Sequence, residues 1–221
     1  MTKYNLGIAG ILGLILLVWN CTSKTETDSK LPILGNRYTE ERMENGQKTV
    51  DTVYHTIASF SLINQDGIIV TNADVKGKVY VADFFFTSCP TICPIMKTQM
   101  LRVYEKFKEE PDFKILSHSI DAEYDTVALL KDYSQRIGVE DASTWHFLTG
   151  DQEHIFEIGQ TSYLTTAMED KSEPGGFLHS GAFVLIDRKG RIRAIYDGTK
   201  EDQVNRLMKD IPKLLEESDG I

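Results

Sequence analysis

Two of the three cysteines of this 221-residue chain, Cys89 and Cys93, lie four positions apart in the stretch FTSCPTICP. Two thiols at this spacing can form a disulfide bond, bind a soft metal ion, or do both in turn. Pro90 and Pro94 follow the cysteines directly. Proline fixes φ and is tolerated in loops and in the first turn of a helix, so the pattern predicts a stiff loop that holds both sulfur atoms near a helix start.

The spacing of the cysteine pair helps to distinguish a redox disulfide from a metal site. Thioredoxin-type thiol–disulfide oxidoreductases have two residues between their cysteines, whereas this chain has three. The larger ring can still close a disulfide, and it also lets two thiolates turn toward one metal ion. The N–H groups and partial positive charge of a helix N-terminus favour the thiolate over the thiol. Thiolates select soft ions, chiefly Cu(I) and Zn(II), and a closed structural zinc site would need four ligands.

The elements around the pair alternate between strands and helices. Residues 57–78 predict two short strands about a turn at 65–67, an N-terminal β-hairpin. Residues 78–86 are almost continuously apolar, as expected of a strand buried on both faces. Helices are expected over 94–110, over 125–139 with Asp125 as N-cap, over 151–163 with Asp151 as N-cap, and over 200–217, and further strands over 113–121, 144–150 and 180–198.

This order predicts an α/β protein with a central mixed sheet flanked by helices. A cysteine pair at the end of the first central strand, opening the next helix, is the placement found in a thioredoxin-like fold. In such a sheet the loop that ends at His179 lies across from the cysteine loop, so His179 is the candidate third ligand. Packed or surface positions are expected for the other histidines, which are His55, His118, His146 and His154.

The first twenty residues differ from the rest of the chain. Lys3 precedes an apolar run from Leu6 to Trp19, which as a helix would span about 21 Å, less than the roughly 30 Å of a bilayer core. That length suits a secretory signal. Cys21 and a polar stretch follow, an order that resembles a bacterial lipoprotein signal with Cys21 as the lipidation site. An uncleaved membrane anchor and a freely soluble product are the alternatives.

The chain is therefore divided into a signal or anchor segment (1–20), a tether and lead-in (21–54) and one thioredoxin-like domain (55–221). The net charge of -9 and the pI of about 5.1 argue against nucleic-acid binding, which needs a basic face. A lipoprotein signal predicts a membrane-anchored protein on the extracytoplasmic, periplasmic side. Disulfide bonds persist in that compartment.

Three stretches together resemble the SCO/SenC family of copper-binding proteins that help assemble cytochrome c oxidase. They are FTSCPTICP, SIDAEYDT and LHSGAFVLIDRKGRI, and the similarity runs from about residue 57 to residue 215. The resemblance implies a copper ion, Cu(I) or Cu(II), held by Cys89, Cys93 and His179. The chain departs from the family pattern at Ala122, where a proline is usual, and at Leu178, where an acidic residue is frequent.

The resemblance implies a metallochaperone rather than an enzyme, one that helps to metallate the dinuclear copper centre of an oxidase subunit. Other copper carriers or thiol reductants are further expected partners. The alternative is a thiol–disulfide oxidoreductase that uses Cys89 and Cys93 as a redox pair on an oxidase subunit or another envelope protein. A third reading is a tethered binding module in which Cys89 and Cys93 form a static disulfide.

Overall fold

The computed structural model describes residues 30–44 and 46–217, so the predicted signal segment and Cys21 lie outside the described residues. The strands in chain order are β1 (Arg37–Glu44), β2 (Gln47–Tyr54), β3 (Ser61–Asn64), β4 (Ile69–Thr71), β5 (Val79–Phe85), β6 (Phe113–Ser119), β7 (Trp145–Thr149), β8 (Ala167–Glu169), β9 (Phe177–His179), β10 (Ala182–Ile186) and β11 (Ile192–Asp197). The helices are α1 (Asn72–Val75), α2 (Cys93–Phe107), α3 (Val127–Arg136), α4 (Gln152–Glu157), the π-helix η1 (Ile158–Ser162) and α5 (Glu201–Glu216).

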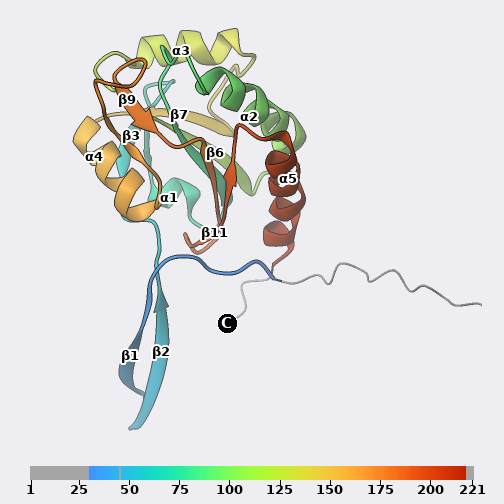
Figure 1. Cartoon of the computed structure of the whole chain (residues 1–221). Coiled ribbons are helices and arrows are strands. Elements are labelled where there is room, and N and C mark those ends of the chain that lie inside the picture. The colour runs from blue at the N-terminus through green and yellow to red at the C-terminus, as the bar shows by residue number, and fades with distance from the viewer. Residues whose placement is uncertain (1–29, 45, 218–221) are drawn as a thin grey trace, which may run out of the picture.

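A seven-stranded sheet in the order β11-β10-β5-β6-β7-β3-β4 forms the centre of the domain. Strands β5, β6 and β7 are parallel, and the remaining pairs are antiparallel. Helices α2 and α5 lie on one side of the sheet and α4 lies on the other (Figure 1). The predicted thioredoxin-like fold with a mixed sheet is confirmed, and so is the N-terminal hairpin, which is β3–β4 at the sheet edge.

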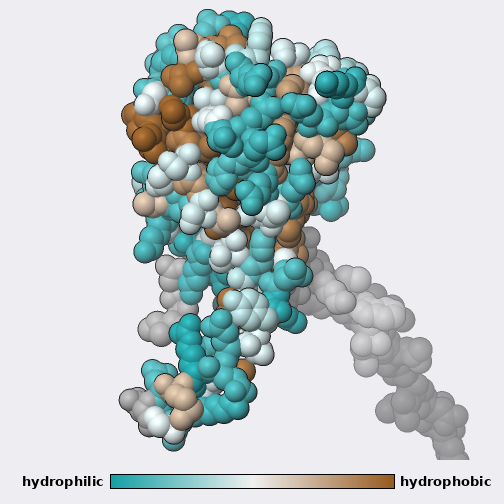
Figure 2. All heavy atoms as spheres, turned by 90° about the vertical axis from the view of Figure 1, so that its left-hand side faces the viewer, coloured by the Kyte–Doolittle hydropathy of each residue, from teal (hydrophilic) through white to brown (hydrophobic). Residues whose placement is uncertain are grey.

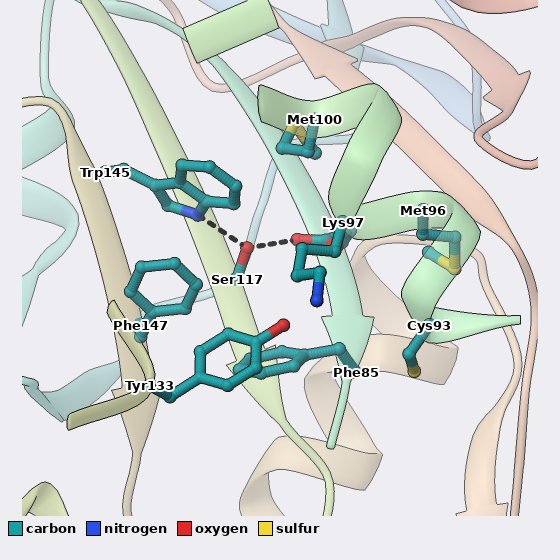
Figure 3. Close-up of a pocket in the computed structure, with 10 residues that line it drawn as sticks. Phe85, Cys93, Met96, Lys97, Met100, Ser117, Tyr133, Trp145 and Phe147 are labelled. Carbon is teal, nitrogen blue, oxygen red and sulfur yellow. Dashed lines mark hydrogen bonds between the residues drawn. The ribbon is translucent and has the colours of Figure 1, made fainter. Parts of the chain in front are cut away.

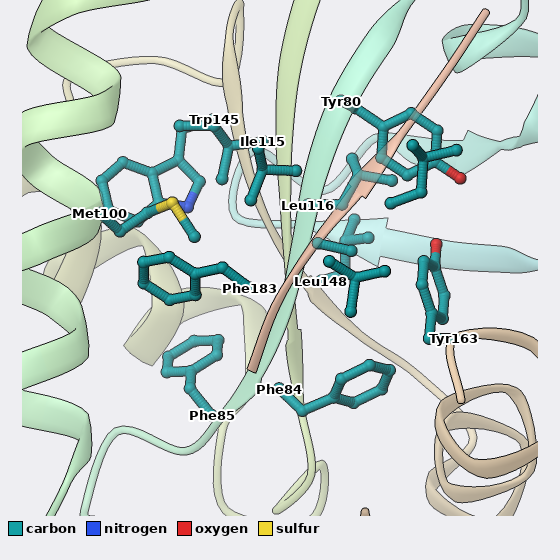
Figure 4. Close-up of a cluster of buried hydrophobic side chains, with 14 of the residues drawn as sticks. Tyr80, Phe84, Phe85, Met100, Ile115, Leu116, Trp145, Leu148, Tyr163 and Phe183 are labelled. Atoms are coloured by element: carbon teal, nitrogen blue, oxygen red, sulfur yellow. The ribbon is translucent and has the colours of Figure 1, made fainter. Parts of the chain in front are cut away.

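Strand β5 runs through the hydrophobic core. All seven of its residues are buried, as its continuous apolar sequence predicts. Figure 4 shows Phe85, Met100 and Phe183 on the α2 side of the sheet, with Tyr80 and Tyr163 on the other side. Burying a side chain of this size contributes roughly 1.5–3 kcal/mol. Packing on both faces therefore fixes the end of β5, where the cysteine loop begins.

A second hairpin, β1–β2, was not predicted and lies within the segment interpreted as a tether and lead-in. It projects from the domain as an arm (Figure 1), and every residue of β1 is exposed. Figure 2 shows the arm as mostly hydrophilic, whereas hydrophobic residues gather on the upper part of the domain. The polar sequence hid the strands, because neither strand alternates apolar and polar residues. The Asn-Gly dipeptide at positions 45–46 was the available hairpin signal.

Two further details differ from the predicted elements. Asp125 does not cap α3, because the N-cap is Thr126, whose hydroxyl accepts a hydrogen bond from the Leu129 N–H at 3.3 Å. The short pair β8–β9 forms in the stretch expected to be a glycine loop before β10. Among the described residues, no helix has the length and apolar character needed to cross a membrane.

Candidate metal centre

Three elements bring the predicted site residues together. Cys89 lies in the loop after β5, Cys93 is the first residue of α2, and His179 is the last residue of β9. The Nε2 atom of His179 lies 3.3 Å from the Cys93 Sγ and 3.8 Å from the Cys89 Sγ. All three side chains are buried, and their donor atoms lie within 4.8 Å of one another. The structure thus brings the three predicted site residues together.

The cysteine loop is built by short-range bonds and by one aromatic ring. The Cys89 N–H donates to the Phe86 carbonyl at 3.2 Å, which closes a turn before the first thiol. Pro94 occupies the first turn of α2, where its missing N–H costs nothing. The Phe86 ring meets the His179 ring edge to face, with the centroids 5.7 Å apart. The loop and the histidine therefore share one hydrophobic wall.

Glycine is required where the histidine segment crosses this wall. Gly175 has φ +91°, and a Cβ there would lie 2.8 Å from a carbon of the Phe86 ring. A larger residue would push the 175–179 segment away from the cysteine loop. Gly175 therefore has a packing role as well as a conformational one.

Burial and hydrogen bonding give the two thiols different acidities. Burial alone would raise the pKa of Cys89, but hydrogen bonds from the Cys93 thiol and from the backbone of Thr91 and Cys93 outweigh it, so the net pKa is lowered. For Cys93, burial dominates and raises the pKa, even though this residue begins a helix. The expectation that the helix start favours the thiolate therefore fails at Cys93 in the metal-free site, where desolvation is the larger effect.

The imidazole of His179 directs one of its two nitrogens at the thiols. Burial lowers its pKa, so the ring is neutral at pH 7. Its Nε2 points at the sulfur atoms, and its Nδ1 is buried with no hydrogen bond among the described residues. A neutral imidazole with one nitrogen directed at two thiols is a suitable donor for a soft or borderline metal ion.

Behind Cys93 lies a narrow pocket with a polar end. Asp83 accepts a hydrogen bond from the Ser117 hydroxyl at 2.5 Å, and Ser117 in turn accepts one from Trp145 Nε1 at 2.9 Å (Figure 3). Burial raises the pKa of Asp83 to about 7, although the Ser117 bond acts in the opposite direction. Cys93 and Asp83 both line this pocket. The carboxyl was not singled out from the sequence, where it appears as one polar residue in an apolar strand.

The other four histidines make packing or polar contacts with residues other than the cysteines. His118 is buried in β6 and stacks on Phe84. His146 of β7 contacts Asn64 through its Nδ1. His55 contacts the Ser162 carbonyl from the loop after β2, and His154 lies on α4 beside Glu157. None of them belongs to the group of donors that includes His179.

The site defines a class of protein. Two cysteines between a central strand and the following helix face a histidine from the segment that leads into β10, on a thioredoxin-like sheet. Such a site can bind a metal ion through two sulfur atoms and one nitrogen, or can form a disulfide if the sulfur atoms approach to about 2.05 Å. The SCO1/SenC family model matches residues 48–216, and the chain belongs to this family.

Individual relatives agree with this assignment. The SCO1 protein homolog of Bacillus subtilis (strain 168) is 32% identical over 168 residues, which cover 75% of this chain and 86% of the relative. The structure of a SCO1/SenC family lipoprotein from Bacillus anthracis str. Ames has a TM-score of 0.67 at 33% identity and covers 73% of this chain and 96% of its own.

Two further solved structures bear on chemistry. BsSco, described as a member of the Sco family of cytochrome c oxidase assembly proteins with a disulfide switch, is 30% identical with a TM-score of 0.64, over 74% of this chain and 95% of its own. Arabidopsis thaliana ScoI, solved with copper bound, is 27% identical with a TM-score of 0.58, over 71% of this chain and 98% of its own.

Proposed function

We propose that this protein is a membrane-tethered copper chaperone that binds one copper ion through Cys89, Cys93 and His179. It would deliver the ion to the dinuclear copper centre of a cytochrome c oxidase subunit on the extracytoplasmic side. The observation that carries the proposal is the convergence of two buried free thiols on one imidazole nitrogen. Copper in Arabidopsis thaliana ScoI and the oxidase-assembly role of the BsSco family support it.

Copper loading must be coupled to proton release. Each cysteine binds a metal ion as the thiolate, so binding displaces the protons that the free thiols carry. Because burial raises the pKa of Cys93, its proton is the one that opposes loading most strongly. Copper affinity is therefore expected to increase with pH. Delivery proceeds as thiolates of the acceptor replace these ligands one at a time, so that the ion stays coordinated throughout.

The tether belongs to the same proposal. Residues 1–20 form the signal or anchor, Cys21 is the lipidation site, residues 21–54 are the tether and lead-in, and residues 55–221 form the functional domain. The lipoprotein from Bacillus anthracis supports this arrangement. Labelling cells with a radioactive fatty acid tests it, because the label is expected on the parent protein and absent from Cys21→Ser.

A thiol–disulfide oxidoreductase is the second candidate, favoured by the unequal acidity of the two thiols. Cys89, with the lower pKa, would attack a disulfide of the target protein and release one target thiol. Cys93 would then attack the mixed disulfide, which leaves the target reduced and the Cys89–Cys93 disulfide oxidised. In this role no metal ion is bound, so disulfide exchange would not require His179 as a ligand.

Copper binding to the reduced protein separates the two functions. Copper stoichiometry is measured after challenge with a competing chelator for the parent, Cys89→Ser, His179→Ala and the matched control His154→Ala. The chaperone predicts one retained copper in the parent and in His154→Ala, weaker retention in His179→Ala, and none in Cys89→Ser. No retained copper in the parent, together with disulfide exchange that survives His179→Ala, would contradict the chaperone and favour the oxidoreductase.

A further inference from the structure

We infer that Asp125 is a positioning residue that sets the geometry of the cysteine loop through Thr87. The inference deepens the proposed function and rests on it for its copper readout. Among the described residues, the Asp125 carboxylate makes no hydrogen bond to a cysteine or to His179. It acts on the site through the backbone from Thr87 to Cys89, which has only Ser88 in between.

The Asp125 carboxylate is completely buried and accepts three hydrogen bonds. Its Oδ2 accepts from the Thr87 N–H at 3.0 Å and from the Ser119 hydroxyl at 2.6 Å. Its Oδ1 accepts from the Thr87 hydroxyl. A buried carboxylate is costly unless it is hydrogen-bonded, so three donors on one group form a stable and specific link.

These bonds join the structures on which the cysteine loop depends. Ser119 is the last residue of β6 and pairs with Phe85, the last residue of β5. Thr87 is the second residue after β5, at the start of the loop, and Asp125 immediately precedes the N-cap of α3. One carboxylate therefore fixes the departure of the loop relative to both parallel strands and to α3.

The loop between Thr87 and Cys89 has few other constraints. Ser88 is exposed, and the Cys89 N–H donates to the Phe86 carbonyl. Without the bonds to Thr87, the turn at residues 86–89 would keep the Cys89–Phe86 backbone bond but would lose its link to β6 and α3. The Cys89 Sγ would then lie at variable distances from the Cys93 Sγ and from His179 Nε2. A metal ion and a disulfide both require these distances to be short, so both functions are expected to depend on Asp125.

The test compares Asp125→Ala with Asp125→Asn. The alanine variant removes all three hydrogen bonds. The asparagine variant can keep three bonds in the same places, because its amide oxygen can accept from the Thr87 N–H and the Ser119 hydroxyl while the Thr87 hydroxyl turns to accept from its NH₂ group. Asp187→Ala is the matched control. Asp187 is also a buried carboxylate with several hydrogen bonds, but it lies beside the start of β5, at the end of the sheet opposite the cysteine loop. The full-length protein is purified in detergent, and thermal unfolding is recorded for every variant.

Two readouts distinguish positioning from general stability. The first is the equilibrium of the Cys89–Cys93 dithiol and disulfide in glutathione buffers, which needs no copper. The second is copper affinity under chelator competition, together with the absorption band of the Cu(II)–thiolate bond. Asp125→Ala is expected to shift the disulfide equilibrium about tenfold toward the dithiol, because a looser loop brings the sulfur atoms together less often. It is also expected to weaken copper binding at least tenfold and to alter the absorption band.

The conservative variant and the control decide the outcome. Asp125→Asn should stay close to the parent in both readouts, and Asp187→Ala should lose stability with both readouts unchanged. If Asp125→Ala folds and keeps the parent's disulfide equilibrium, or if Asp187→Ala changes it equally, the inference is wrong. If Asp125→Ala does not fold, Thr87→Val removes only the hydroxyl bond and should shift the equilibrium in the same direction, whereas Thr87→Ser should not. A parent without copper binding would contradict the proposed function alone, because the disulfide equilibrium still tests Asp125.

Discussion

At the scale of single residues, the sequence predicts which side chains come together in the candidate site, but not how their environment changes their acidity. Cys89, Cys93 and His179 follow from residue type, spacing and the family resemblance. Their acidities do not, because burial depends on side chains distant in the sequence, such as Phe86, whose ring packs against His179. A helix N-terminus predicts an acidic thiol at Cys93, yet desolvation is stronger there.

This difference predicts unequal reactivity of the two thiols. In the reduced, metal-free protein, iodoacetamide should modify Cys89 well before Cys93, because the thiolate is the nucleophile and the pKa of Cys89 is lowered whereas that of Cys93 is raised. The labelled cysteine is identified by mass spectrometry of peptides at successive times. Unfolding in urea provides the control, since both cysteines should then react at similar rates. Faster labelling of Cys93 in the folded protein would contradict the prediction.

Asp83 predicts a pH dependence of stability. Its pKa is raised from 3.8 to about 7 by burial, so the folded state favours the neutral acid. The corresponding stability is present below pH 4 and is lost as the pH rises through 7, a change of up to about 4 kcal/mol. Asp83→Asn stays neutral at every pH and should be more stable than the parent at pH 8.5, with little difference at pH 4. Urea unfolding of the reduced proteins at both values measures this.

A carboxylate of opposite character provides the comparison for Asp83. Hydrogen bonds from Lys78 and Arg188 lower the pKa of Asp112, so its stabilising effect is present at neutral pH and is lost on acidification. Asp112→Asn should therefore be less stable than the parent at pH 8.5. If Asp83→Asn behaved in the same way, the buried acid would be ionised at low cost and the interpretation of Asp83 would be wrong.

At the scale of elements, the sequence predicts the strands and helices that are apolar and regular. Strand β5 and helices α2 and α5 were expected within a few residues of their bounds. The β1–β2 arm and the β8–β9 pair were missed, because the first has no apolar face and the second is only three residues per strand. Asp125 was misassigned because a local cap and a long-range link to Thr87 look alike in sequence.

Helix α5 contains a local defect that predicts a measurable coupling. Pro212 lies inside the helix and has no N–H for the Met208 carbonyl, to which the Lys106 ammonium of α2 donates instead at 3.2 Å. Pro212→Ala should restore the helix bond and raise the free energy of unfolding by about 1–3 kcal/mol. Lys106→Met should lower the free energy of unfolding by about 0.5–1 kcal/mol in the parent, and by clearly less in a protein that already carries Pro212→Ala. Urea unfolding of the four proteins completes this double-mutant cycle, and strictly additive effects would exclude the coupling.

At the scale of the whole molecule, the N-terminal segment and the candidate metal centre lie at opposite ends of the sheet. Arg193 is buried and donates to the carbonyls of Leu31 and Pro32, and it pairs with Asp187 and Glu217. Register places Ile186 beside Tyr80 near the start of β5, whereas the cysteine loop follows its end. Seven residues of strand separate these ends by about 20 Å. A membrane tether attached before residue 31 would therefore leave the metal centre facing away from its point of attachment.

This arrangement predicts which N-terminal residues the fold needs. A chain that begins at Ile33 lacks the carbonyls of Leu31 and Pro32 and leaves part of the buried Arg193 guanidinium without partners, so it should be less stable than one that begins at Lys30 by about 1–3 kcal/mol. Urea unfolding measures the difference, and the thiol reactivity of Cys89 should be equal in both chains because the site lies at the other end.

The exposed arm supplies the matched deletion for this comparison. The His55 N–H donates to the Asn36 carbonyl at 2.9 Å, so the two chain segments that flank the β1–β2 arm lie side by side at its base. The variant replaces residues 37–54 with a short Gly-Ser linker in the chain that begins at Lys30. It removes many more residues than the truncation to Ile33, yet it should lower the free energy of unfolding by less. The reason is that the arm buries almost nothing and that a two-stranded hairpin is only marginally stable alone. If loss of the arm destabilised the domain more than loss of residues 30–32, the Arg193 cluster would not be what secures the N-terminal segment.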